Sequence, residues 1–569
     1  MSLRLLLEDF LGLMREEGEL DVYLPLLLSA MGHEIVFRAQ KGPRQYGVDI
    51  VSVGVDKDRR KKLFLWLVKC GDIGRSEWSV GKQSIRQSIE DVGDVYLSSH
   101  IAPQHRKLTK KLVVLTNGDF KSELTQTLAG YLNNWSKQND VGTEMVNGST
   151  LAAWTEDNLL DENALPPANK TLFRRMLANI PTPELCLQAG YTLIDNLVVD
   201  GTTKVASVNA QRKKHLSALR AIRTALSILF IRGQREGNLL GPYRLAEFAL
   251  LRVWAGFQDP LSANNKEITT EFSQLLVHLL GVAEAYHAKL QVFYCVKDAF
   301  ASVLPDNLLV AERVFDELGR LGLNGYIWAH LGASSGDQGA IERAHICSAR
   351  IAALIDTHAC VNSPCYDHQA IDLHMALLCL MATNRFDLAK TWLHDLIVRL
   401  QYVSQVQVKR YWPLNATFQQ ALELRTGSDE FLEEYANTSM LIPILALWAA
   451  ALGMPEGYTF IRNSIAPQIP DTTLNVWNSD VGFENTIASY KLLCEHGVAE
   501  AIHSFPENPG QYISELATPI PGLQSIDESL WYRSNVPYLP LLAALHWRLQ
   551  IPREMMARQA TALADAKQI

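Results

Sequence analysis

The amino-acid sequence predicts an α/β domain with a mixed central sheet over about residues 1–165, followed by a large all-α helical array. Up to about residue 160, short apolar segments rich in β-branched residues alternate with segments of helical spacing. Beyond about residue 170 the apolar spacing is almost entirely helical. Between these parts, residues 161–170 carry the Pro166–Pro167 pair, which indicates a linker.

In the first part, apolar spacing predicts helices at 3–17 and 21–31, and Gly32 ends the second because glycine readily adopts the left-handed cap conformation. Strands interleaved with further helices predict a mixed sheet that is covered on both faces. The expected strands are 33–39, 48–55, 63–69, 111–119 and 143–148, and the further helices are 81–91, 120–135 and 151–160.

In the second part, helices separated by short turns predict a helical domain over 170–505. The segment 384–396 resembles one unit of a tetratricopeptide-like helical hairpin, although no period of about 34 residues is found elsewhere. Residues 506–527 contain four prolines, so a long loop is expected there. That loop and a short C-terminal helical piece make up a third part, 506–569.

Composition restricts the class of protein. The net charge of -8 and the pI near 6.0 argue against a chain that is basic throughout, as a nucleic-acid coat would be. Eight scattered cysteines make no disulfide framework and fit a reducing cytoplasm. Acids interrupt the apolar N-terminus from Glu8 onward, so no signal peptide is expected. The longest apolar run, 440–454, is shorter than the ~20 residues of a membrane span, and we expect a cytoplasmic protein without a membrane segment.

Asp49 and Lys69 are the residues that point most directly to chemistry. Asp49 begins the second expected strand, Lys69 ends the third, and the charged hairpin 56–62 joins them, so both belong to one neighbourhood. A carboxylate suits Mg²⁺ or Mn²⁺, which polarises a phosphate and activates a water, and a lysine can position that water or neutralise developing charge. Taken singly, Asp49 could instead be an Asx cap and Lys69 a solvated strand end.

The segment 47–50 (GVDI), followed by an apolar strand that ends in Lys69, resembles the PD-(D/E)xK nuclease superfamily, and most of all its Mrr-type restriction endonuclease branch. The resemblance covers about residues 1–165 and none of the helical region. It implies a restriction-endonuclease-like fold, a site with Asp21, Asp49 and Lys69 as catalytic residues, and DNA as substrate. Further segments that agree in order and spacing are 20–21 (LD), 113–120 (VVLTNGDF) and 145–154 (MVNGSTLAAW).

Leu67 departs from this family, whose second motif has an acid or glutamine two residues before the lysine. An aliphatic side chain cannot ligate a metal, so one ligand is missing. Asp49, Asp21 and the backbone carbonyl of Val68 could still hold Mg²⁺ together with waters, because this ion keeps much of its hydration. The alternative is a fold kept for binding after its chemistry was lost. Candidates for a migrated polar contact are Glu77, Gln83, Gln87 and Glu90.

Local charge favours a polyanionic partner. Residues 38–111 contain sixteen Lys or Arg against eight Asp or Glu, in an otherwise acidic chain. Such clusters give salt-dependent, sequence-independent affinity for a phosphate backbone. They could also be solvated loop charges that keep sheet edges from pairing. The candidate DNA contacts are Arg38, Lys41, Arg44, Arg59, Arg60, Lys61, Lys62, Arg106, Lys107, Lys110 and Lys111.

Other patterns carry less weight. Gly81-Lys82 lacks the spacing of a phosphate-binding loop, and Gly332 to Gly336 matches G-x-S-x-G but is expected between helices rather than after a strand. Cysteines and histidines gather in one loop region, but the spacing is not a common zinc pattern, and we expect no zinc there. The residues concerned are His358, Cys360, Cys365 and His368.

The sequence therefore predicts a metal-dependent DNA endonuclease whose helical region acts as a sensor, a dimerisation surface or a dock for a protein partner. The alternative is a catalytically inactive nuclease fold that binds nucleic acid or a protein partner. By the resemblance alone, fusion of such a domain to a helical region is similar to bacterial anti-phage or restriction systems.

Overall fold

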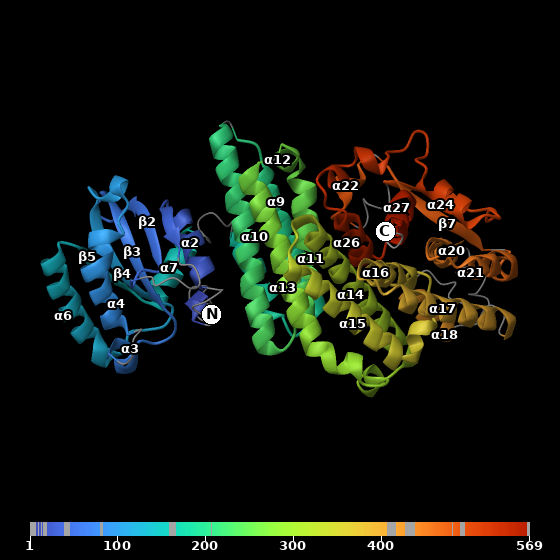
Figure 1. The fold of residues 1–569 in the computed structure, drawn as a ribbon, viewed down its shortest axis with the longest axis horizontal. Coiled ribbons are helices and arrows are strands. Elements are labelled where there is room, and N and C mark those ends of the chain that lie inside the picture. The colour runs from blue at the N-terminus through green and yellow to red at the C-terminus, as the bar shows by residue number, and fades with distance from the viewer. Residues whose placement is uncertain are drawn as a thin grey trace. The chain divides into compact units, whose positions relative to one another are not determined.

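The computed structural model describes residues 7–8, 11–12, 14, 20–38, 46–79, 84–158, 167–205, 207–263, 265–406, 417–426, 438–470, 472–480, 482–489 and 496–565. Tertiary contacts divide the chain into two compact units. The first comprises residues 1–201 and 207–241, and the second comprises 202–206 and 242–569. Figure 1 labels many of the helices and strands of both.

A five-stranded mixed sheet forms the centre of the N-terminal part of the first unit (Figure 1). Its strands lie in sequence order; β1, β2 and β3 pair antiparallel, whereas β4 and β5 run parallel to β3. The expected mixed sheet is confirmed, and each expected strand overlaps an observed one. The strands are β1 Glu34–Arg38, β2 Ile50–Val55, β3 Lys61–Lys69, β4 Thr109–Thr116 and β5 Gly142–Val146.

Helices cover both faces of this sheet, as Figure 1 shows. On one face, Leu65 and Leu67 of β3 share an apolar core with residues of α3, α4 and α6. On the other face, Trp66 contacts Trp154 of α7 edge to face, with ring centroids 6.3 Å apart, and α7 packs against α2. The helices are α2 Asp21–Ala30, α3 Arg75–Ser79, α4 Ile85–Asp91, α5 Leu97–Ser99, α6 Ser122–Asn139 and α7 Gly148–Asn158, with the π-turn η2 at Val92–Tyr96.

Three long helices complete the first unit: α8 Pro167–Ala178, α9 Pro183–Thr202 and α10 Val208–Glu236. Pro167 is the first residue of α8, where the missing N–H of proline removes no helical hydrogen bond. The predicted linker, 161–170, therefore ends inside a helix, and its residues up to 166 lie outside the described part of the chain. Most of the helix expected at 3–17 also lies outside it.

The second unit is mainly helical, as predicted, and α14 and α16 are at its centre. Gly322 of α14 lies so close to α16 that a Cβ added there would be 2.4 Å from the backbone carbon of Met375, so only glycine permits this approach. Its first helices are α11 Leu240–Gly256, α12 Gln258–Ser262, α13 Lys266–Cys295, α14 Asn307–Ser335, α15 Gln338–Thr357, α16 Gln369–Ala382, α17 Phe386–Val406 and α18 Phe418–Thr426.

Two sequence expectations are wrong in the part of the chain after residue 437: the helical domain over 170–505 and the loop over 506–527. The domain is not all helical, because a small sheet of order β6-β7-β8 forms from Thr438–Ser439, Thr473–Ser479 and Gly497–Ala501. The loop expected over 506–527 contains helix α24, Pro509–Ala517, whose first turn is capped by the Asn508 side chain accepting from the N–H of Gly510 at 2.8 Å. Prolines at a helix start are compatible with the helix, so counting them overestimated the loop.

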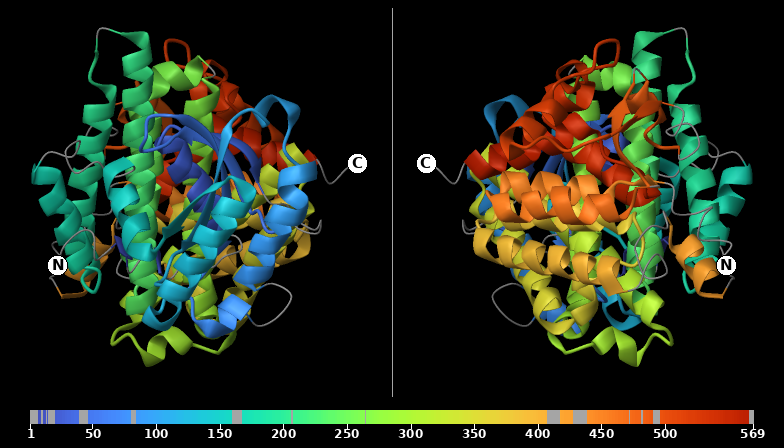
Figure 2. Two further views of the ribbon diagram at one scale, coloured as in Figure 1. Left: turned by 90° about the vertical axis from the view of Figure 1, so that its left-hand side faces the viewer. Right: turned by 90° about the vertical axis from the view of Figure 1, so that its right-hand side faces the viewer.

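Helices α20, α24 and α27 pack around this part of the chain; Figure 2 shows them side by side in orange and red. The remaining helices are α20 Leu441–Ala451, α21 Pro455–Phe460, α22 Phe483–Thr486, α25 Leu530–Arg533, α26 Tyr538–Trp547 and α27 Arg553–Asp565. Within the described residues, no helix combines the length and the apolar character that crossing a bilayer requires.

A buried network of ion pairs links α11, α14, α16 and the end of α26. Arg320 on α14 pairs with Glu247 of α11 at 2.5 Å and with Asp316 at 2.9 Å. The guanidinium of Arg548 contacts both Asp316 and Asp372 of α16 at 2.6 Å. Arg548 ends α26 in the left-handed conformation (φ 57°), which costs a non-glycine residue about 1–2 kcal/mol. The two carboxylates hold the side chain of Arg548 in place at this position.

Replacing Asp372 by asparagine should change how stability depends on pH. Burial raises the pKa of Asp372 from 3.8 to about 7, so the folded chain binds this proton more tightly than the unfolded chain. The group's contribution to stability is full below about pH 4 and is lost as the pH rises through about 7. We expect the wild type to lose stability relative to Asp372→Asn across that window in urea unfolding. A difference between the two proteins that does not change with pH would contradict this.

Candidate active site

Asp49 and Lys69 lie at the same end of the five-stranded sheet. Asp49 directly precedes β2, and its N–H donates to the carbonyl of Trp66 at 2.8 Å. The N–H of Val68 donates to Asp49 Oδ2 at 2.7 Å, which holds the carboxylate against β3 one residue before Lys69. Because the N–H and C=O of one strand residue point to the same side of the strand, the Val68 carbonyl lies on the side of Asp49.

Leu67 faces the apolar core and supplies no ligand. Its side chain is 1% exposed, and it belongs to the same cluster as Leu65. The β2–β3 register pairs Ile50 with Trp66, so continuing it by one residue sets Asp49 opposite Leu67. The position that the nuclease resemblance assigns to a second acid or glutamine is thus filled by a core side chain.

Asp21 is exposed at the start of α2. This helix packs on β1 and α7, on the face opposite to α4 and α6. Asp49 and Lys69 therefore share one end of the sheet, whereas Asp21 begins a helix on the face opposite to α4 and α6.

The candidate supporting side chains are engaged elsewhere. Glu77 accepts hydrogen bonds from the Ser76 hydroxyl at 2.6 Å and the Gly74 N–H at 2.8 Å, and these bonds lower its pKa. Gln87, on the exposed side of α4, donates to Asp91 at 3.1 Å. Glu90 accepts from Arg86 at 3.1 Å, also on α4. Gln83 lies outside the described residues, as do Gly81 and Lys82.

The residues at this sheet end fit a loosely held Mg²⁺ rather than a closed metal cage. In the described part of the chain, no three His, Cys, Asp or Glu side chains come together in a group that could hold a metal ion. Asp49 offers one carboxylate, and Val68 offers one backbone carbonyl on the same side. Magnesium commonly binds through one or two carboxylates, with waters and substrate phosphates completing the shell.

Asn117 is a structural residue of this sheet end that the sequence analysis did not single out. It follows β4, accepts from the N–H of Gly71 at 2.7 Å, and donates to the carbonyls of Leu11 at 2.7 Å and Met14 at 2.8 Å. It thereby joins the N-terminal segment to the loop after β3. Asn117 is part of the strand expected at 111–119 but lies one residue beyond β4, at the carboxyl end of a strand, where ligand sites in α/β sheets form.

Most of the predicted DNA-contacting residues lie at the other end of the sheet. Lys61 and Lys69 are the first and last residues of β3, so about 26 Å separates them at roughly 3.3 Å per residue. The start of β4 lies beside the start of β3, which brings Lys107 and Lys110 to the hairpin end. Arg59, Arg60 and Lys61 are exposed there.

Arg38 belongs to the Asp49 end, because the register of β1 with β2 places its backbone opposite Ile50. Lys41 and Arg44 lie outside the described residues. Arg106 also lies at the hairpin end, before β4, where its Nε donates to the Ile101 carbonyl at 3.4 Å. Most of the predicted DNA-contacting residues that the structure describes therefore lie at the end of the sheet opposite to Asp49.

Lys62 and Lys111, two of the predicted DNA-contacting residues at the hairpin end, form ion pairs within the domain. Asp56 accepts from Lys62 at 2.7 Å and from Lys111 at 2.8 Å, and both ammonium groups are largely buried. Lys62 also pairs with Asp58 at 2.7 Å, and Lys111 with Glu144 at 2.8 Å. Burial by itself would raise the pKa of Asp56, but the lysine hydrogen bonds hold it well below its usual value.

Two further patterns that the sequence offered, Gly332 to Gly336 and the cysteine and histidine loop, lie in the second unit. The segment Gly332 to Gly336 is the C-terminal end and cap of α14, with Gly336 at φ 71°, so its serine is on a helix rather than on a strand-to-helix turn. Cys360 lies in a short 3₁₀ helix, Ala359–Asn362, and burial raises the pKa of its thiol to about 12.

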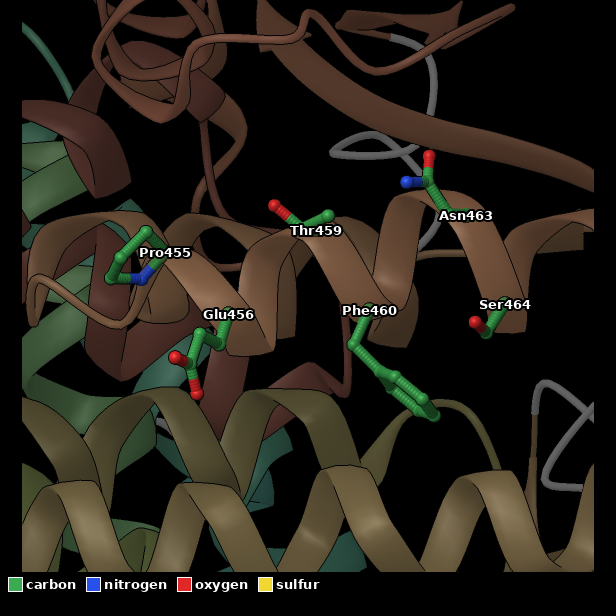
Figure 3. Close-up of a pocket in the computed structure, with 6 residues that line it drawn as sticks. All are labelled: Pro455, Glu456, Thr459, Phe460, Asn463 and Ser464. Atoms are coloured by element: carbon green, nitrogen blue, oxygen red, sulfur yellow. The ribbon is translucent and has the colours of Figure 1, made fainter.

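One hollow of the second unit, of about 410 Å³, lies along a single helical segment made of α21 and the π-turn Ile461–Ile465. Figure 3 shows that its labelled side chains all project from this segment. Among the described residues no other element contributes to it, so it is a surface depression. Its lining residues are Pro455, Glu456, Thr459, Phe460, Asn463 and Ser464.

Replacing Asp56 by asparagine should destabilise the sheet domain in a pH-dependent way. The change leaves two largely buried lysines each with one acidic partner fewer, and we expect a loss of about 2–3 kcal/mol at neutral pH. Because the folded pKa is depressed, this contribution is present above the unfolded value of 3.8 and is lost as the pH falls below it. Urea unfolding would measure it, with the exposed Asp94→Asn as the matched control. Equal stability of the two variants at neutral pH would contradict the ion-pair network.

Comparison with known proteins assigns no family to this geometry. No family model matches the chain, and neither a curated protein nor a solved structure matches it. A function for the site must therefore be inferred from the chain's own residues.

Proposed function

We propose that the N-terminal domain is a metal-dependent DNA endonuclease that hydrolyses phosphodiester bonds at the end of the sheet marked by Asp49 and Lys69. The observation that carries the proposal is the 2.7 Å hydrogen bond from the Val68 N–H to Asp49 Oδ2. It holds a carboxylate beside a backbone carbonyl and one residue from a lysine, at the carboxyl end of a strand. Nuclease chemistry requires these three groups close together.

Asp49 and the Val68 carbonyl would hold Mg²⁺ or Mn²⁺, which supplies Lewis-acid activation of the phosphate and of a bound water. Lys69 follows directly on the same strand. Its ammonium group would neutralise charge that develops on the phosphate oxygens during hydrolysis. The remaining metal ligands would be waters and the substrate itself, because Leu67 provides none.

The exposed cations of the hairpin end support DNA as the substrate. About 26 Å separates Lys61 from Lys69, which corresponds to roughly eight base pairs at 3.4 Å each. A duplex lying along the sheet could therefore reach the site while its backbone contacts Arg59, Arg60 and Lys61. Ion pairing removes Lys62 and Lys111 from this set and leaves Lys107 and Lys110 in it.

We assign the helical unit to sensing or to docking of a protein partner or a second copy of this chain. This arrangement is similar to that of bacterial anti-phage or restriction effectors, by analogy with the resembled family. The reducing cytoplasm, which the scattered free cysteines fit, is the compartment where such an effector would meet DNA.

The nuclease proposal predicts that Asp49→Asn and Lys69→Ala each reduce cleavage of plasmid DNA by about 100-fold or more in Mg²⁺ or Mn²⁺. Asparagine can still accept the Val68 N–H, so Asp49→Asn removes the charge while keeping this hydrogen bond. Asp94→Asn and Lys137→Ala, at exposed positions on η2 and α6, serve as matched controls and should cut like the wild type.

Equal cutting by the wild type and by the Asp49→Asn, Lys69→Ala double variant would refute this assignment of the site. Calorimetric titration with Mn²⁺ adds a readout that does not need turnover. Wild-type protein should bind the ion, and Asp49→Asn should bind it at least about tenfold more weakly.

The burial of Leu67 favours a second candidate function, an inactive nuclease fold that binds nucleic acid or a protein partner. A side chain 1% exposed in the core at this position contributes to packing and leaves the metal with one ligand fewer. In this case the exposed cations would still bind DNA, with an affinity that falls steeply as salt is raised.

Leu67→Glu separates the two functions. If the chemistry has been lost, cleavage should appear only in the glutamate variant, because the carboxylate restores the missing ligand opposite Asp49. If the site works with leucine, the variant should lose wild-type activity. Leu67→Met, which keeps an apolar side chain of similar volume, controls for the change in packing, and unfolding midpoints show whether each variant is folded.

A further inference from the structure

A second hollow, in the second unit, has the size and lining of a small-molecule site. It measures about 340 Å³, at the lower end of the roughly 300–1,000 Å³ that ligand pockets occupy. Its walls come from the residue before α16, from β7 and β8, from α22, and from the end of α26 and the residues after it. The residues that carry the argument are His368, Trp477, Phe483, Ala499, Arg548 and Gln550.

Trp477 and Phe483 form an aromatic corner of this hollow. Their ring centroids are 5.4 Å apart and the ring planes are inclined by 57°. The indole lies directly over Gly497 of β8, where an added Cβ would be 1.9 Å from the ring, so glycine is required for this placement. Ala543 and Ala544 of α26 add apolar surface. Such a surface suits stacking by a planar ring.

Gln550 is a lining residue of the same hollow and carries an unsatisfied polar atom. Its Nε2 donates to Asn475 Oδ1 at 2.9 Å, whereas its Oε1 is buried and has no hydrogen-bond partner among the described residues. Turning the carboxamide exchanges the two atoms but still leaves one of them without a partner. A buried polar atom in this state is destabilising, so a turn of the Gln550 side chain toward the hollow would let a ligand with a complementary hydrogen-bonding edge satisfy it and gain affinity.

Among the described lining residues of the hollow, the one guanidinium has acidic partners. Arg548 is the one guanidinium among its described lining residues, and it already pairs with Asp316 and Asp372, each at 2.6 Å. Burial and the positive charge of Arg548 lower the pKa of His368 to about 4, so this imidazole is neutral at physiological pH. A phosphate or carboxylate inside the hollow would find no free cation among these described residues.

We propose that this hollow binds an uncharged planar heteroaromatic ring with hydrogen-bonding groups on its edge, namely the base of a nucleoside or nucleotide. The ring stacks on Trp477, and its edge bonds to Gln550. Stacking on an aromatic side chain together with hydrogen bonds to a carboxamide is a general way in which proteins recognise bases. The ligand would bind to the second unit, whether or not the sheet domain cleaves DNA.

Isothermal titration of the full-length chain with adenosine, guanosine, cytidine and uridine tests this, with ribose as the negative control. We expect at least one nucleoside to bind at submillimolar concentration. For that nucleoside, Trp477→Ala should weaken binding about tenfold or more, Trp477→Phe should retain most of it, and Gln550→Leu should weaken it by at least several-fold.

Ala499→Leu and Val498→Leu form a matched pair. Ala499 lines the hollow opposite Trp477 in the β7–β8 register, whereas Val498 is exposed on the other face of β8. Filling the hollow with Ala499→Leu should abolish binding, and Val498→Leu should leave it unchanged. Unfolding midpoints verify that both variants are folded.

Three results would overturn the proposal: no nucleoside binds at millimolar concentration, Ala499→Leu binds as tightly as the wild type, or ribose binds as well as the nucleosides. The 5′-monophosphate distinguishes the part of the ligand that is recognised. It should bind within about threefold of the nucleoside, and a much tighter monophosphate would refute an uncharged site.

Discussion

Burial of β3 on both faces is the constraint on which the sheet domain depends. It is the middle strand of five, and residues 63 to 68 are all buried. Because side chains alternate, a shift of one residue would exchange the contents of the two cores, so packing specifies the register strongly. That register sets Asp49 against the backbone of Val68, directs Leu67 into the core, and makes Lys69 the first residue to leave it. The same packing therefore explains both the groups present at the candidate site and the ligand that it lacks.

The length of β3 also keeps the charged residues of the hairpin end apart from those of the Asp49 end. Lysines stand at both ends of the strand, and the exposed cations predicted to contact DNA, Arg59, Arg60 and Lys61, lie at the hairpin end. There, Asp56 and Glu144 neutralise Lys62 and Lys111 while the more exposed arginines stay available to a partner. A count of charges along the sequence overestimates the field that a polyanion would meet, because short ion pairs cancel part of it.

In the second unit, Arg548 belongs both to the buried ion pairs and to the lining of the proposed binding site. Its ion pairs join α14 and α16 to the end of α26, and the same residue lines the hollow beside Trp477. Partnered charges can be buried where a lone charge could not, and their mutual compensation leaves the hollow without net attraction for anions. The left-handed backbone at Arg548 is tolerated because the side chain is held at two points.

Local patterns in the sequence determined much of this protein. Alternating and helical apolar spacing located the strands β1–β5 and the helical character beyond residue 170, because these periods are properties of short segments. The common sheet end of Asp49 and Lys69 also followed, since a hairpin forces its strands to be antiparallel. Only the tertiary structure decided that Asp21 lies on a helix of the opposite face, that Asp56 pairs with Lys111, and that short strands form a second sheet around β7. These outcomes depend on contacts between residues far apart in the chain, and a local pattern carries no information about such contacts.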